Sequence, residues 1–280
     1  MRIKWPFEMT GTLVAVFLLS TGIVKPAMKL VDVSFSMASP ITLHEPVAVH
    51  VTIKNQTADV LTFDLGLNQQ TAFHIVVIAP DGRQGELPLG VNRGMGSLAL
   101  LKPRGKYSKV LVLNEWYPFD VEGDYRIRIT LELPIVALGP EMQLTKSFDK
   151  WDHQIEKAVL DLTILPRNEA VLKETCETLL RKVHEAEQNP ERSAAANELS
   201  YIKDPVAIPY LGKLAGEREE FPAIRGLQRI GTDEVWEAMI AVTKSEYDWI
   251  AASMAKDILR EKLPTIRNPN IRKKVEAGIK

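Results

Sequence analysis

Cysteine is almost absent from this chain of 280 residues, which has Cys176 and no other. A single thiol excludes an intramolecular disulfide and a zinc site built from several cysteines, so packing must stabilise the fold. An oxidising compartment is still possible, because a lone thiol cannot mispair within its own molecule. We expect Cys176 to be a small core residue.

Net charge is nearly absent as well, because 35 lysines and arginines face 36 acidic residues and the formal net charge is -1. This balance argues against a protein that neutralises a polyanion through a basic face, so we expect no nucleic-acid partner. Hydrophobic residues make up 45% of the chain, enough for two cores. Two folded domains are therefore expected.

The N-terminus lacks an apolar run long enough for a transmembrane helix. Its apolar stretch, residues 11–24, falls short of the roughly 20 residues that a membrane-spanning helix needs. It follows the basic residues Arg2 and Lys4, as in a signal peptide. We expect residues 1–27 to be a signal peptide or an N-terminal anchor and the protein to be extracytoplasmic, periplasmic or secreted. No clean cleavage site is visible, so membrane association through an uncleaved segment stays open.

Residues 28–166 show short segments in which apolar and polar residues alternate. In residues 47–55 the side chains of Val47, Val49, Val51 and Ile53 fall on one side of an expected strand. About seven such segments, separated by turn residues, predict an immunoglobulin-like antiparallel β-sandwich. The alternating apolar residues should form its core.

The segment DVEGDYRI, residues 120–127, resembles the tyrosine corner of such sandwiches, with Tyr125 in the role of the corner tyrosine. Together with LHEPVAVHVTIKN and LNEWYPFDVEGDYRI, it resembles bacterial extracytoplasmic Ig-like domains and, more distantly, BsuPI-type proteinase inhibitors. These motifs mark a fold and imply no active site.

Residues 167–280 change to helical spacing of apolar residues. Asn168 is expected to cap a helix whose buried face includes Val171 and Cys176. An internal repeat follows, because the apolar positions from Ala195 to Leu214 recur 28 residues later from Ala223 to Val242. In this repeat Asp204 and Thr232 are the expected caps of the second helix in each pair, and a weaker third copy begins at Leu263.

The strings ELSYIKDPVAIPYLGKLAG and GLQRIGTDEVWEAMIAV resemble the short HEAT-like repeats of phycobilin lyases and bacterial scaffold proteins. The resemblance implies a short α-solenoid over residues 167–280. A simple helical bundle is the alternative.

Catalytic and metal-binding motifs are missing from the sequence. It has no GxSxG, P-loop or GxGxxG motif, and its five histidines show no metal-ligand spacing. His50 and His74, on the outer faces of expected strands, are the least implausible pair for a metal. The glycine-rich stretch from Gly90 to Leu98 is expected to be an inter-strand loop. We therefore predict that the protein is not an enzyme and that it has no catalytic residues, bound metal or cofactor.

Two groups of residues are candidate partner-binding sites. Trp116 and Tyr117 follow an expected strand, although Trp116 filling the sandwich core is an equal alternative. Near the C-terminus, basic residues predict contact with anionic lipid headgroups or an acidic protein, with a solvated cationic cap as the alternative. The basic candidates are Arg267, Arg272, Lys273 and Lys274.

The expected function is that of an exported, non-catalytic protein that binds another protein or acts as a scaffold, with an unknown protein partner. A regulator that resembles a proteinase inhibitor and acts through a sandwich loop is the second hypothesis. An enzyme with a site at the domain junction is the third.

Overall fold

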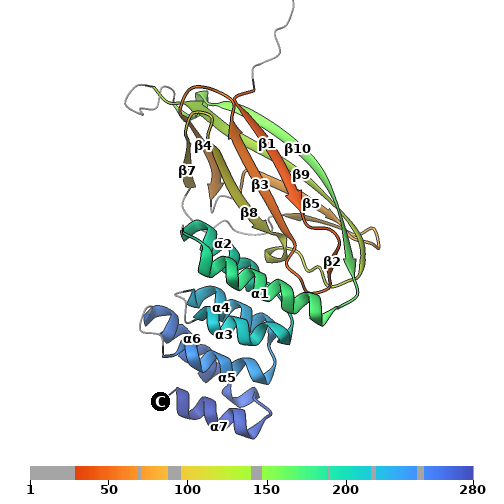
Figure 1. The fold of residues 1–280 in the computed structure, drawn as a ribbon, viewed down its shortest axis with the longest axis vertical. Helices are drawn as coiled ribbons and strands as arrows, with labels where there is room; N and C mark the ends of the chain where they lie inside the picture. Colours follow the sequence, from red (N-terminus) through yellow and green to blue (C-terminus); the bar gives the residue numbers. More distant parts are fainter. Residues whose placement is uncertain are drawn as a thin grey trace, which may run out of the picture.

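The fold is known from a computed structural model that describes residues 29–67, 71–87, 96–139, 147–187, 189–215, 219–244 and 249–279. Two β-sheets form a sandwich in the N-terminal part, and a helical region follows them (Figure 1). The expected signal peptide or anchor, residues 1–27, lies outside the described residues. Among the helices that are described, none is long and apolar enough to cross a membrane.

Ten strands form the two sheets of the described residues, three more than the sequence predicts. They are β1 (Val31–Met37), β2 (Ile41–Thr42), β3 (Ala48–Asn55), β4 (Leu61–Leu67), β5 (Phe73–Ile78), β6 (Gln84–Leu87), β7 (Gly96–Leu101), β8 (Lys106–Val112), β9 (Gly123–Ala137) and β10 (Asp152–Leu165). The sequence misses β2, β6 and β7. β2 has only two residues and β6 has no alternating apolar pattern, so neither gives a period-two signal.

The two sheets differ in size and bury their facing sides. The smaller sheet has the strand order β1-β3-β8, and the larger has β2-β10-β9-β4-β7 with β5 and β6 attached to β9. Val47, Val49, Val51 and Ile53 are at most 1% exposed, as the alternation predicts. The outward-facing His50 on the same strand is only partly covered.

The long strand β9 organises the larger sheet. One of its edges pairs with β10 over 13 residue pairs, from Gly123 with Ile164 to Ile135 with Asp152. Its other edge pairs first with β5 and then with β4. β9 and β10 therefore extend along the sandwich, and β10 leads directly into the helices (Figure 1).

Tyr125 makes the hydrogen bond that the tyrosine-corner prediction requires. Tyr125 is buried, and its hydroxyl donates to the backbone carbonyl of Val121 over 2.8 Å. Its ring packs against Phe119 with the centroids 5.3 Å apart, and against Tyr117 at 6.5 Å. This bond closes the turn that precedes β9.

Seven α-helices follow the sandwich in the described residues, and they stack in two layers. They are α1 (Glu169–Glu185), α2 (Asn189–Leu199), α3 (Ile208–Ala215), α4 (Glu220–Ile230), α5 (Asp233–Val242), α6 (Trp249–Lys262) and α7 (Pro269–Gly278). One layer runs through α1, α3, α5 and α7, and the other through α2, α4 and α6. A second hydrophobic core lies between the layers.

Asn168 caps α1 as predicted, whereas Asp204 caps a 3-10 helix, Pro205–Ala207, that leads into α3. Asn168 accepts hydrogen bonds from the backbone N–H groups of Ala170 and Val171, and Asp204 accepts one from Val206. Thr232 occupies the cap position of α5, but its side chain makes no capping hydrogen bond. The preceding residue, Gly231, ends α4 in the left-handed conformation at φ 68°.

One predicted core position in α1 is wrong. Val171 is 37% exposed, whereas the neighbouring Leu172 is fully buried. Adjacent helical residues point about 100° apart, so Val171 faces the sandwich instead of the helical core. Cys176, on the same face as Leu172, is fully buried as predicted.

Replacing Tyr125 with Phe should lower the free energy of unfolding by about 1 kcal/mol, because the substitution removes one partly buried hydrogen bond and little else. Tyr117→Phe is the matched control, since the Tyr117 ring lies in the same cluster and its hydroxyl has no hydrogen bond to a described residue. Urea unfolding measures both. Equal effects of the two substitutions would contradict the role assigned to the Tyr125 hydroxyl.

Candidate functional site at the junction of sandwich and helices

The chain passes from sandwich to helices through a segment that β2 holds in place. Ile41 and Thr42 pair in parallel with Ile164 and Leu165 at the end of β10. The Thr42 hydroxyl donates to the carbonyl of Pro166 over 2.6 Å and accepts from the backbone N–H of Asn168 at 2.8 Å. The linker between the two regions is thus hydrogen-bonded almost residue by residue.

A buried carboxylate lies beside this linker. Asp204, which is 1% exposed, accepts hydrogen bonds from the Arg167 guanidinium at 2.6 Å (Nε) and 3.0 Å (Nη2). His44 Nδ1 lies 3.1 Å from Asp204 Oδ2, and His44 adopts the left-handed backbone conformation at φ 77°. Asp204 therefore ties together the sandwich, the linker and the start of the α3 segment.

The charge of Asp204 is stabilised by this setting. The hydrogen bonds from Arg167 lower the pKa of Asp204 to about 2, against the opposing effect of burial, and the pKa of Arg167 is raised by the same contact. A carboxylate paired in this way stays ionised over the whole physiological range. The sequence predicts Asp204 as a helix cap but misses its partners.

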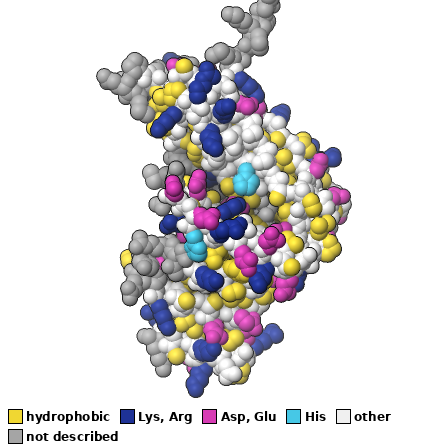
Figure 2. Space-filling model, in the orientation of Figure 1, with side chains coloured by type: hydrophobic (Ala, Val, Ile, Leu, Met, Phe, Trp, Pro, Cys, Tyr) yellow, Lys and Arg dark blue, Asp and Glu magenta, His cyan; other side chains and the backbone are white. Residues whose placement is uncertain are grey.

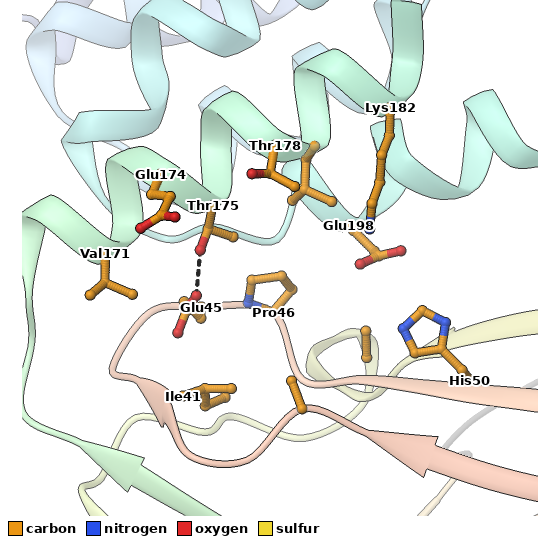
Figure 3. A pocket seen from close by; sticks show the side chains of 13 residues that line it. Ile41, Glu45, Pro46, His50, Val171, Glu174, Thr175, Thr178, Lys182 and Glu198 are labelled. Carbon is orange, nitrogen blue, oxygen red and sulfur yellow. Dashed lines mark hydrogen bonds between the residues drawn. The ribbon is translucent and has the colours of Figure 1, made fainter. Parts of the chain in front are cut away.

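Glu45 makes a second connection from the β2 turn to the helices. Its Oε2 accepts from the backbone N–H of Thr42 at 2.6 Å, and its Oε1 accepts from the Thr175 hydroxyl on α1. Figure 3 shows this bond between the turn and the helix. The same turn thus contacts both the linker and α1.

A groove of about 370 Å³ lies between the sandwich and helices α1 and α2. Leu179 forms part of its apolar wall. Figure 3 shows the apolar Ile41 and Pro46 in this lining, together with the polar residues His50, Lys182 and Glu198. Burial and the nearby charge of Lys182 lower the pKa of His50. Burial raises the pKa of Glu198.

A second hollow, of about 480 Å³, lies between α1 and α3 on the layer formed by α1, α3, α5 and α7. Lys173, Arg181 and Lys213 line it with exposed cationic side chains. Glu177, also in the lining, accepts a hydrogen bond from the Tyr210 hydroxyl at 3.1 Å. Lys213 Nζ lies 5.9 Å from the centre of the Tyr210 ring.

Trp116 and Tyr117 lie at the end of a short 3-10 helix, Leu113–Glu115. Both side chains are half-buried and pack against the sandwich core. The Tyr117 ring lies 5.0 Å from that of Phe119. The two candidates therefore combine a structural contact with partial exposure.

Arg267, Arg272, Lys273 and Lys274 are exposed at the last helix. Arg272 pairs with Glu276 at 3.4 Å, and Lys274 pairs with Glu237 of α5.

These basic residues lie far from the N-terminal end of the sandwich. The start of β1 lies at one end of the molecule, and α7 lies at the other (Figure 1). Figure 2 shows acidic and basic side chains intermixed over the helical region on the face in view.

The structure does not bring together the histidines considered as metal ligands. His50 lies on the outer face of the smaller sheet, and His74 lies on the outer face of the larger one. Among the described residues no group of three or more His, Cys, Asp or Glu side chains is arranged to hold a metal ion.

The thiol of Cys176 is buried in the helical core. Burial raises the pKa of this thiol to about 12.

The glycine-rich stretch from Gly90 to Leu98 is described only in part. Its first six residues lie outside the described ranges, and Gly96, Ser97 and Leu98 begin strand β7. The expectation of a loop is therefore wrong for these last three residues.

Comparison with solved structures gives remote likenesses, among them two that differ in how much of this chain they cover. The PapD-like domain 7 of human CEP192 covers 58% of this chain and all of its own length at 14% identity and a TM-score of 0.29. Astrotactin-2, a vertebrate-specific, perforin-like membrane protein, covers 80% of this chain at 10% identity and a TM-score of 0.22, and 38% of its own length is matched. No protein-family model and no curated protein matches the chain.

Replacing Asp204 with Asn should lower the free energy of unfolding by about 2 kcal/mol at neutral pH, because the carboxyl pKa falls from 3.8 to about 2 on folding. A depressed carboxyl pKa contributes stability above the unfolded value. That contribution is lost as the pH falls through the folded value. The difference between wild type and Asp204→Asn in urea unfolding should therefore shrink between about pH 4 and pH 2.

Asp120→Asn is the control for this prediction. Asp120 faces Lys203 at 3.5 Å across the same junction, but both side chains are exposed, so the expected effect is below about 0.5 kcal/mol. A difference between wild type and Asp204→Asn that stays constant down to pH 2 would show that the charge of Asp204 is not the stabilising feature.

Proposed function

We propose that this chain is an exported, non-catalytic interaction protein in which an immunoglobulin-like sandwich carries a short HEAT-like solenoid that binds a partner protein. The observation that carries this proposal is the hollow between α1 and α3, lined by exposed cationic side chains on one layer of the helical stack. Its chemistry fits an acidic segment of a partner.

The Ig-like assignment of the sandwich is supported by its two facing sheets and by the corner tyrosine. The Tyr125 bond to Val121 lies at the start of β9, where such sandwiches place this tyrosine. An isoleucine, Ile127, stands two residues later and is fully buried, so the contact between the sheets is apolar there.

The HEAT-like assignment of the helices is supported by equal burial at positions 28 residues apart. Five pairs of apolar residues occupy equivalent positions in the two copies, and none of their ten residues is more than 3% exposed. The equivalent pairs are Ala195 and Ala223, Leu199 and Leu227, Ala207 and Val235, Leu211 and Met239, and Leu214 and Val242. Ile202 is fully buried, and its counterpart Ile230 is partly buried against the same core. Each pair of helices thus buries the same stripe against its neighbours.

Partner binding at the α1–α3 hollow follows from charge and exposure. Lys173 and Arg181 are exposed, and neither forms an ion pair with a described residue. The one acidic lining residue, Glu177, is engaged by Tyr210. An acidic segment would meet unpaired cations and the apolar surface of Leu180 and Pro209.

Export is proposed from the basic start and apolar run of residues 1–27. The described chain begins at the end of the sandwich that lies away from the helices (Figure 1). An uncleaved N-terminal anchor would therefore leave the helical stack directed away from the membrane. This arrangement suits a protein that presents a binding face to a partner.

The double substitution Lys173→Glu and Arg181→Glu should abolish co-purification of the partner in the native host and leave the melting temperature within about 2 °C of wild type, because both side chains are exposed. A photo-crosslinking residue at position 181 should capture the same partner. The measurement is affinity purification followed by identification of the captured protein.

Lys157→Glu and Arg128→Glu form the matched control, since both are exposed cations on the outer face of the sandwich. Loss of the partner in this control variant, or its retention in the α1 variant, would exclude the α1–α3 hollow as the binding face.

A further inference from the structure

We infer that the groove between the sandwich and helices α1 and α2 is a binding site for a lysine or arginine side chain carried by an extended segment of a partner protein, with Glu198 as the residue that receives its charge. The inference rests on the proposed function only in requiring a protein partner. The groove is separate from the α1–α3 hollow and lies on the sandwich side of α1.

Glu198 is a buried glutamate whose carboxylate receives no hydrogen bond from the described residues. Its side chain belongs to α2 and the residue is 8% exposed, yet its carboxylate has no hydrogen bond or ion pair with any described residue. Figure 3 shows the carboxyl group directed into the space between Pro46 and His50. Burying such a group costs free energy that an arriving hydrogen-bond donor recovers.

The walls of the groove match the stem of a long cationic side chain. Ile41, Pro46, Ala48 and Leu179 supply apolar surface on the way to Glu198. Lysine and arginine combine an apolar stem with a charged end, so they bury the stem against such walls and bring the charge to the carboxylate. The volume of about 370 Å³ has room for one such side chain, and the groove is open to solvent so that the main chain can remain outside.

The charge of the lining also favours a cation. Three glutamates, Glu45, Glu174 and Glu198, and one lysine, Lys182, line the groove, which gives a net charge of -2 with His50 neutral. Burial and Lys182 both favour the neutral form of His50 by lowering its pKa. Glu45 is engaged by Thr42 and Thr175, so Glu198 is the inner acid left for a ligand.

Lys182 is the competing cation within the molecule. It is exposed at the edge of the groove, and its charge acts on Glu198, but it makes no ion pair with that carboxylate. A ligand cation must approach against the charge of Lys182. Removing that charge should therefore strengthen binding, whereas removing the charge of Glu198 should weaken it.

The test titrates the full chain with a blocked pentapeptide, Gly-Ala-Lys-Ala-Gly, and follows the methyl resonances of Ile41 and Leu179 by NMR. The arginine peptide is tested in the same way, and the norleucine peptide is the matched control because it keeps the apolar stem without the charge. We expect saturable shifts with lysine or arginine and at least about tenfold weaker binding of norleucine.

Two variants give opposite expectations. Glu198→Gln keeps the shape of the side chain and should weaken binding of the cationic peptide at least about tenfold, with the melting temperature unchanged or raised. Lys182→Met should tighten it about threefold or more, because the repulsion is removed. Glu185→Gln, an exposed acid of α1 outside the groove, should leave the affinity unchanged.

The inference is overturned if neither cationic peptide gives saturable shifts, if norleucine binds as well, or if Glu198→Gln binds like wild type. If free n-butylammonium binds as tightly as the lysine peptide or more tightly, the claim that the occupant is a side chain of a protein segment is contradicted. Lys173→Glu with Arg181→Glu should still bind the peptide. Failure of the α1–α3 proposal therefore leaves this test intact.

Discussion

The structure depends on one buried carboxylate that is shared by both regions of the chain. Asp204 begins the segment that leads into α3, yet it is held by Arg167 of the linker and by His44 of the sandwich. A carboxylate that is 1% exposed needs partners to stay charged, and two of them come from outside the helical stack. The ordering of the helices and their attachment to the sandwich are therefore coupled through this group.

A single turn connects Asp204 to the two candidate binding surfaces, which are the groove between the sandwich and the helices and the α1–α3 hollow. Residues 41–46 hold the linker through Thr42, Asp204 through His44, and α1 through Glu45. The same turn supplies Ile41 and Pro46 to the groove in which Glu198 is buried. Because α1 forms one side of both the groove and the α1–α3 hollow, displacement of this turn would alter both.

Local patterns in the sequence predict much of the fold. Alternation identifies the buried face of β3, and the Gly-Asp-Tyr segment identifies the Tyr125 corner. The two-residue strand β2 has no such pattern, because its place is decided by pairing with residues more than 120 positions away. Val171 and Leu172 are both apolar, and the sequence does not show that the sandwich, and not the helical core, faces Val171.

The candidate sites are harder to predict than the fold. The capping role of Asp204 is a local signal, but its partners Arg167 and His44 are 37 and 160 residues away. Glu198 belongs to a helix whose polar and apolar residues are only weakly segregated, so its burial follows from the position of the sandwich and from no local pattern.

The central claim is that the junction fixes the helical stack relative to the sandwich, and a distance between spin labels measures this most directly. Labels at Lys157→Cys on β10 and Lys273→Cys on α7 use exposed positions, and the buried thiol of Cys176 should remain unlabelled. Double electron–electron resonance should give one narrow distance distribution at neutral pH. A broad or multimodal distribution in this doubly labelled protein, whose junction residues are unchanged, would contradict a fixed junction.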